Sequence, residues 1–262
     1  MNEKLEQVTS RDGTSIAVWR TGEGPPLVLV HGAAADHSRW APVLPALGER
    51  FTVLAMDRRG RRPSGDADGY AIEREYEDVA AVVEWAGEAV DVLGHSHGGV
   101  CALEATLLTD KIRKLVVYEP PMGFLKSSPE VVTRLEELLN AGEHDELVAF
   151  FMREVARLPP DQVELLRSMP AWAGRVAVAD TIPREERANT AYVFDNEHFR
   201  HVRVPTLFLL GGDSAEPFKV AAEAVQAALP DCRIVVMRGQ RHAAMDTATE
   251  LFTSEVLGFL QS

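Results

Sequence analysis

The sequence predicts an α/β fold in which a mostly parallel, doubly wound sheet carries a helical segment inserted after its sixth strand. Short apolar runs recur along the chain, as in strands that are buried on both faces of a parallel sheet. Segments with helical periodicity separate most of these runs, which indicates right-handed crossovers with helices on both faces. Residues 119–203 show no strand pattern, so this interval is the predicted insertion.

Eight strands are expected, and the first two form a hairpin. Residues 5–9 and 14–19 flank a turn at Arg11-Asp12-Gly13, which predicts antiparallel strands at one edge of the sheet. The other six strands are apolar runs, at residues 26–30, 51–56, 90–93, 112–118, 205–210 and 233–237.

Helices are expected on both sides of the insertion and within it. Outside the insertion, apolar residues recur at helical spacing in residues 72–85, 100–108, 218–229 and 251–260. Inside it, Ser128-Pro129-Glu130 has the pattern of a helix start and Gly142 that of a helix end. We therefore expect a core domain of residues 1–121 and 204–262, and a helical lid of residues 122–203.

Composition and cysteine usage indicate an intracellular globular protein. A hydrophobic content of 46% and a charged content of 26% are ordinary for a soluble domain. No apolar stretch approaches about 18 residues, so no membrane span is expected. Residues 1–6 lack the pattern of a secretory signal, and Cys101 and Cys232 lie in runs expected to be buried. These features predict a cytoplasmic protein with reduced cysteines.

The charge distribution argues against a nucleic-acid partner. The net charge is −13, and the only basic run, residues 58–62, is too short to mark a phosphate-binding surface. Acidic residues concentrate in one segment, at Glu73, Glu75, Glu77, Asp78, Glu84, Glu88 and Asp91. We interpret this segment as a solvated helix face that aids solubility.

The most informative motif is the hexapeptide Gly-His-Ser-His-Gly-Gly at residues 94–99, between a predicted strand and a predicted helix. A Gly-x-Ser-x-Gly in this context indicates a nucleophile elbow, whose turn is so tight that glycines must flank the serine. The turn exposes the hydroxyl of Ser96 and directs the N–H of His97 toward the reacting oxygen. A phosphate-binding turn is the weaker interpretation, because neither a dinucleotide fingerprint nor a P-loop is present.

A serine nucleophile needs an imidazole base, and the imidazole needs an acid that fixes its tautomer. His242 follows the last predicted strand and precedes the final helix, which is where the elbow fold requires the base. The loop His31-Gly32-Ala33 follows the third strand, so the N–H of Ala33 can join that of His97 in an oxyanion hole. We expect His31 to shape this loop through hydrogen bonds.

Four motifs occur in a fixed order along the chain: His31-Gly32, Asp57-x-Arg59-Gly60, Gly94-x-Ser96-x-Gly98 and Gly-x-x-His242. Together they resemble the motifs of the α/β-hydrolases, in particular lid-bearing serine hydrolases of the esterase type, over the whole chain except the lid. The resemblance implies the α/β-hydrolase fold, a Ser-His-acid triad and no cofactor. Arg62 stands where the family usually has a glycine, so a different loop shape is expected there.

The resemblance leaves the acid of the triad open between two residues. Many relatives carry an aspartate after the seventh strand, as Gly-x-x-Asp, and this chain has Asp213 one position earlier. Other relatives, such as some haloalkane dehalogenases, carry the acid after the sixth strand, where this chain has Glu119. Glu119 and Asp213 are therefore alternative candidates for the residue that orients His242.

No metal site is expected, although His31, His37, His95 and His97 all come near the elbow. No compact set of aspartate, glutamate or cysteine accompanies them, and we expect His95 and His97 to line the pocket. Aromatic and other apolar residues of the lid are expected to pack against the sheet, and some to face Ser96. This composition favours an apolar or aromatic acyl group as the small-molecule substrate.

The sequence thus predicts a serine hydrolase that cleaves a carboxylic ester or a related acyl bond through an acyl-enzyme. Thioesterase, lactonase, carbon–carbon bond hydrolase and perhydrolase chemistry stay open, because the same triad serves them on this fold. A non-catalytic ligand-binding protein, and a lyase or isomerase that uses His242 without acylation, are further alternatives. Dehalogenase and epoxide hydrolase chemistry is disfavoured, because relatives with those activities carry an aspartate at the position of Ser96. The oligomeric state is not predicted.

Overall fold

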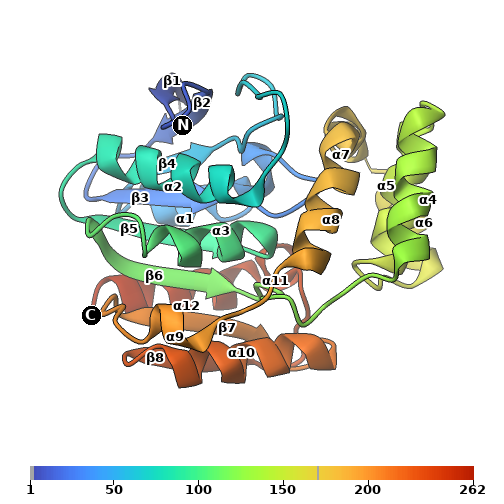
Figure 1. Ribbon diagram of the computed structural model, residues 1–262. Coiled ribbons are helices and arrows are strands. Elements are labelled where there is room, and N and C mark those ends of the chain that lie inside the picture. The colour runs from blue at the N-terminus through green and yellow to red at the C-terminus, as the bar shows by residue number, and fades with distance from the viewer. Residues whose placement is uncertain (1–2, 170) are drawn as a thin grey trace.

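The computed structural model describes residues 3–169 and 171–262, and its eight strands form one sheet (Figure 1). The strand order is β1-β2-β4-β3-β5-β6-β7-β8. The strands are β1 (Lys4–Thr9), β2 (Ser15–Thr21), β3 (Pro26–Val30), β4 (Thr52–Met56), β5 (Val90–His95), β6 (Ile112–Tyr118), β7 (Thr206–Gly211) and β8 (Cys232–Met237). β2 is antiparallel to both of its neighbours, and the other pairs are parallel. The predicted mostly parallel sheet with antiparallel strands at one edge is confirmed.

Helices cover both faces of the sheet, as the doubly wound prediction requires. They are η1 (His37–Trp40), α1 (Leu44–Gly48), α2 (Ile72–Ala86), α3 (His97–Ala105), α10 (Glu216–Ala228), α11 (Ala244–Thr247) and α12 (Thr249–Leu260). Apolar residues of α2, α3 and α10 pack on one face, and those of α1 and α12 pack on the other. The short helices η1 and α1 have no counterpart in the sequence prediction, because neither spans enough residues to show a helical repeat.

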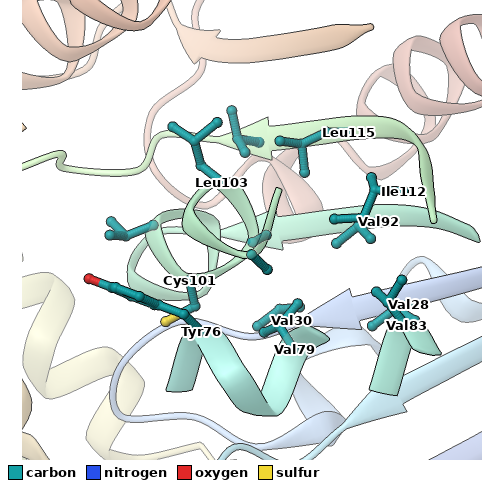
Figure 2. Packing of buried hydrophobic residues seen from close by; sticks show 14 of the residues in the cluster. Val28, Val30, Tyr76, Val79, Val83, Val92, Cys101, Leu103, Ile112 and Leu115 are labelled. Atoms are coloured by element: carbon teal, nitrogen blue, oxygen red, sulfur yellow. The ribbon is translucent and has the colours of Figure 1, made fainter. Parts of the chain in front are cut away.

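Successive side chains of the central strands point to opposite faces of the sheet, and this alternation divides the interior into two cores. On β3, Val28 contributes to the core beneath α2 and α3, while Leu29 contributes to the opposite core beneath α1 and α12. Figure 2 shows the first core, where Val30 and Val92 of the sheet lie among side chains of α2 and α3 that include Val79. This packing anchors β5 and α3, the two elements on either side of Ser96.

A helical insertion, residues 122–203, lies between β6 and β7. Its helices are α4 (Pro129–Asn140), α5 (His144–Glu154), α6 (Pro160–Arg167), α7 (Trp172–Ala177), η2 (Ala179–Thr181), α8 (Ile182–Ala191) and α9 (Asn196–Phe199). Figure 1 shows α4 to α8 beyond the arrowhead end of the sheet. They form a third apolar cluster, which also takes in Ala34 from the loop after β3. The helix start at Ser128 and the helix end before Gly142, whose φ is 71°, lie where the sequence predicts them.

The interpretation of residues 72–91 as a solvated acidic face is wrong for part of the segment. Three of its carboxylates are buried, those of Glu75, Asp78 and Asp91. Arg58 donates to both oxygens of Glu75, and Arg59 donates to both oxygens of Asp78. The turn after β4 lies against α2, so the basic run and the acidic run neutralise each other in the interior.

Two further expectations concern the membrane and the cysteines. Across the described residues, no helix has the length and apolar character needed to cross a bilayer. Cys101 is buried in the core beneath α3, as expected. Cys232 is only half-buried, because it lies on β8, a strand at the sheet edge with a partly exposed face.

We predict that Leu29→Ala destabilises the protein by about 2–5 kcal/mol, because it leaves a cavity in a core that cannot fully collapse. Leu29 is 0% exposed, whereas Leu165 on α6 is 64% exposed, which makes Leu165→Ala a matched control. Urea unfolding followed by circular dichroism measures both, and Leu165→Ala should stay within about 0.5 kcal/mol of wild type. Equal losses in the two variants would contradict the packing described here.

Candidate active site

Ser96 occupies a strained turn between β5 and α3. Its φ of 54° and ψ of −125° lie in a region that side-chain-bearing residues rarely adopt, at a cost of about 1–3 kcal/mol. A Cβ on Gly94 would lie 2.6 Å from the carbonyl oxygen of Gly98, and one on Gly98 would collide with the carbonyl oxygens of Val30 and His31. Glycines at both positions are therefore required, and the turn is as tight as the sequence predicts.

His242 meets a buried carboxylate. Its Nδ1 donates a hydrogen bond to Oε2 of Glu119 at a distance of 2.7 Å. Oε1 of Glu119 accepts a hydrogen bond from the backbone N–H of Gly211, also at 2.7 Å, so each carboxylate oxygen has a donor. Glu119 directly follows β6 at a φ of 47° and is 0% exposed. Like Ser96, it is a residue other than glycine held in the left-handed region at the carboxyl end of a central strand.

Three neighbours fix the loop and ring of His242. The hydroxyl of Tyr118 donates to the carbonyl oxygen of Arg241. Nε2 of His95 donates to the carbonyl oxygen of His242 over 3.1 Å, and burial lowers the pKa of His95 well below its usual value, so this ring is neutral. Phe218 of α10 stacks on the imidazole of His242 with ring centroids 4.7 Å apart. The imidazole is thus held at Nδ1 by Glu119 and on one ring face by Phe218.

Asp213, the other candidate acid, lies in the exposed turn after β7. Its backbone N–H donates to the carbonyl oxygen of Gln240 over 3.0 Å. Within residues 3–169 and 171–262 its carboxylate takes part in no hydrogen bond or ion pair with His242, whereas that of Glu119 does. The structure therefore brings together His242 and Glu119, and leaves Asp213 apart.

The loop after β3 lies against the elbow. A Cβ on Gly32 would be 3.1 Å from Cβ of Ser96. Ala33, from this loop, and His97, the first residue of α3, line the same cavity as Ser96. The structure thus brings both residues expected to form an oxyanion hole to the serine.

Three guanidinium groups bind carbonyl oxygens of this loop. The pairs are Arg58 with Gly32 (3.0 Å), Arg175 with Ala34 (3.1 Å) and Arg61 with Ala35 (3.3 Å).

His31 forms hydrogen bonds through both ring nitrogens. Its Nδ1 donates a hydrogen bond to the carbonyl oxygen of Gly32 at 2.8 Å, and its Nε2 accepts one from the backbone N–H of Arg58 at 3.2 Å. His31 shapes the loop as expected.

A buried network of charges lies beneath the loop and reaches the insertion. Glu185 of α8 pairs with both Arg58 and Arg61. Although burial opposes ionisation, the guanidinium of Arg58 holds the pKa of Glu75 well below its usual range. His97 donates from Nδ1 to Oδ1 of Asn189 on α8 over 2.8 Å, which ties the first residue of α3 to the insertion.

One group in this network has the residue types of a metal site. Ligand atoms of Glu75, His97 and Cys101 lie within 4.8 Å of one another. Both oxygens of Glu75, however, already accept hydrogen bonds from Arg58, and Oε1 also accepts one from Tyr70. The group fits an ion-pair network better than a cation site.

A cavity of about 170 Å³ brings the candidate residues together, since Ser96, His97 and His242 all line it. His95 also lines it, as expected. Apolar side chains of the insertion form much of the wall, at Phe151, Met152, Val155, Ala156, Leu158 and Leu166. Three polar residues of the insertion also line the cavity, Arg175, Glu186 and Asn189. They could not be predicted from the sequence, because no motif or spacing distinguishes them from surface residues.

Comparison with known proteins identifies the family to which this fold and site belong. The model of the alpha/beta hydrolase family matches residues 27–254. The chain belongs to the alpha/beta hydrolase family. A solved structure of an alpha/beta hydrolase from Sphaerobacter thermophilus has a TM-score of 0.87 and 36% identity to it, covering 97% of this chain and 100% of that chain. The fold expected from the motifs is thereby confirmed.

Relatives of this alpha/beta hydrolase include esterases. A solved esterase structure from Rhodococcus sp. has a TM-score of 0.81 and 25% identity, and covers 98% of both chains. A bifunctional esterase/perhydrolase of Acinetobacter calcoaceticus is 28% identical over 278 residues, which is 97% of this chain and 99% of that protein. The protein is thus similar along its whole length to enzymes that hydrolyse esters.

We predict that wild type loses stability as pH rises from 5 to 8, and that Glu186→Gln lacks the part of this loss that Glu186 causes. Burial raises the pKa of Glu186 to about 7 from an ordinary value of 4.5. Between these pH values the folded protein keeps a proton that the unfolded chain has released, so the free energy of unfolding falls as pH rises. From pH 5 to pH 8, wild type should lose roughly 2–3 kcal/mol more than Glu186→Gln in urea unfolding.

Glu137→Gln is the control for this prediction, since Glu137 lies on the exposed surface of α4. This variant should keep the wild-type dependence on pH. The buried acid would be excluded as the cause if wild type and Glu186→Gln lost the same stability between the two pH values.

Proposed function

We propose that the protein is a serine hydrolase that cleaves a carboxylic ester or a related acyl bond of a small molecule. One observation carries the proposal. The imidazole of His242, hydrogen-bonded at Nδ1 to buried Glu119, shares a cavity with a serine held in an elbow turn. A binding protein has no need of an oriented imidazole beside a strained serine, so the arrangement favours catalysis.

In this proposal Ser96 is the nucleophile. As its Oγ attacks the substrate carbonyl, Nε2 of His242 takes the hydroxyl proton, and the N–H groups of Ala33 and His97 stabilise the oxyanion. The tetrahedral intermediate expels the alcohol, which receives the proton from His242, and leaves an acyl-enzyme. Water then attacks the ester of Ser96 with His242 as base, which releases the acid and restores the serine. No cofactor takes part in these steps.

Glu119 is the proposed acid of the triad. Its carboxylate accepts the Nδ1–H of His242, which keeps Nε2 available to receive the proton of Ser96. The backbone N–H of Gly211 holds its second oxygen and so fixes the carboxylate plane. Asp213 has neither contact and is not assigned a role.

Residues 122–203 serve as a lid in this proposal, over a core of residues 1–121 and 204–262. Their apolar side chains, such as Phe151 and Val155, line the cavity that contains Ser96. These walls suit an apolar acyl chain, because burial of its methylene groups contributes about 0.8 kcal/mol each. Perhydrolysis stays open as a further activity, because the Acinetobacter relative is named an esterase/perhydrolase. In perhydrolysis, hydrogen peroxide attacks the acyl-enzyme in place of water.

We predict that Glu119→Gln lowers kcat for p-nitrophenyl butyrate by roughly 10⁴-fold, because the amide favours the wrong tautomer of His242. Asp213→Asn is the matched control and should leave kcat within about twofold of wild type. Spectrophotometric assay of released p-nitrophenolate measures both variants. The assignment would be contradicted by a large loss in Asp213→Asn together with an active Glu119→Gln.

A further inference from the structure

Arg175, on α7 of the insertion, lines the cavity that contains Ser96 and His242. Its Nη1 donates to the carbonyl oxygen of Ala34 over 3.1 Å. In the part of the chain that the structure describes, its other N–H groups make no hydrogen bond, and no carboxylate oxygen lies within 4.0 Å of the guanidinium. Arg175 is therefore a cation that lines the candidate active site and forms no ion pair with any described residue.

The other charged side chains of the cavity wall have partners. Arg39 forms a two-bond ion pair with Asp246, at 2.8 and 2.7 Å. Glu186 accepts the hydroxyl of Ser127 over 2.6 Å, and burial raises its pKa. Among the described residues, neither Asp246 nor Glu186 forms an ion pair with Arg175.

The surroundings of Arg175 favour the binding of an anion. Burial, and then the positive charge of Arg39, lower the pKa of Arg175 to about 10, while the charges of Asp246 and Asp36 act in the opposite direction. The group therefore remains charged at neutral pH. A partly buried guanidinium is stabilised by an anion, and its planar fork matches a carboxylate with two parallel hydrogen bonds.

We propose that Arg175 binds a carboxylate of the substrate, so that the enzyme acts on anionic acyl compounds such as half-esters of dicarboxylic acids. The inference rests on the proposed hydrolysis at Ser96 and specifies its substrate class. The scissile carbonyl lies at Ser96 on the core, and the free carboxylate lies at Arg175 on the insertion. Apolar side chains of the same cavity, such as Met152, contact the methylene groups that join the two ends.

The test compares substrates that differ only in a terminal charge. The half-esters monoethyl glutarate, adipate and pimelate are each paired with the ethyl ester of the monocarboxylic acid in which a methyl group replaces the free carboxylate. Intact enzyme should show a higher kcat/KM for at least one half-ester than for its neutral partner in a pH-stat. Arg175→Gln, whose amide can still donate to Ala34, should reduce that preference about 10-fold to 100-fold, the value of a charge-assisted hydrogen bond.

Arg187→Gln, the same substitution on the exposed surface of α8, is the control and should keep the wild-type preference. If Arg175→Gln lowered kcat/KM equally for charged and neutral esters, Arg175 would only position the loop at Ala34, and the inference would be overturned. A wild-type enzyme without any preference for the half-esters would overturn it too.

A binding measurement separates this inference from the proposed hydrolysis. Calorimetric titration of the intact protein with glutarate, adipate and pimelate should detect binding of at least one of them that Arg175→Gln loses. Such binding without ester turnover would support the carboxylate site and count against the hydrolytic function. Ester turnover without any dicarboxylate binding and without a charge preference would overturn the carboxylate site alone.

Discussion

Three backbone segments meet around Ser96 at distances that exclude a Cβ atom. The end of β3 touches the start of α3 at Gly98, and the turn itself closes between Gly94 and Gly98. The strain of a positive φ at Ser96 persists because β5 and α3 are both buried in the core, where they cannot relax. The same contact places the loop of Gly32 against the serine, so the position of the nucleophile and that of the oxyanion loop have one structural cause.

Buried ion pairs join this loop to the insertion. Arg58 binds the carbonyl oxygen of Gly32 and also pairs with Glu185 of α8. Removing one partner of such a pair costs about 3–5 kcal/mol, because a charge is left uncompensated in the interior. The shape of the oxyanion loop and the placement of α8 therefore depend on each other. His97, bonded to Asn189, adds a second link between the elbow and the same helix.

Local signals in the sequence suffice for the fold, and they single out Ser96 and His242 as candidate site residues, since a motif and an order along the chain mark them. They do not suffice for the acid, because the choice between Glu119 and Asp213 depends on where the loop after β8 meets the end of β6. The buried charges escaped prediction for a similar reason. Arg61 and Glu185 are 124 residues apart, and each looks like a surface residue among its sequence neighbours. Arg175 carries no sequence signal, because its proposed role depends on an ion-pair partner that none of the described residues provides.

The proposed function requires that Ser96 is a nucleophile activated by His242 and Glu119. Its most direct test is a fluorophosphonate, which phosphonylates an activated serine with loss of fluoride, followed by mass spectrometry of the intact protein and of its peptides. We expect a single adduct, on the peptide that contains Ser96, which disappears in Ser96→Ala and forms far more slowly in Glu119→Gln. An unlabelled protein, or a label on another residue that persists in Ser96→Ala, would contradict it.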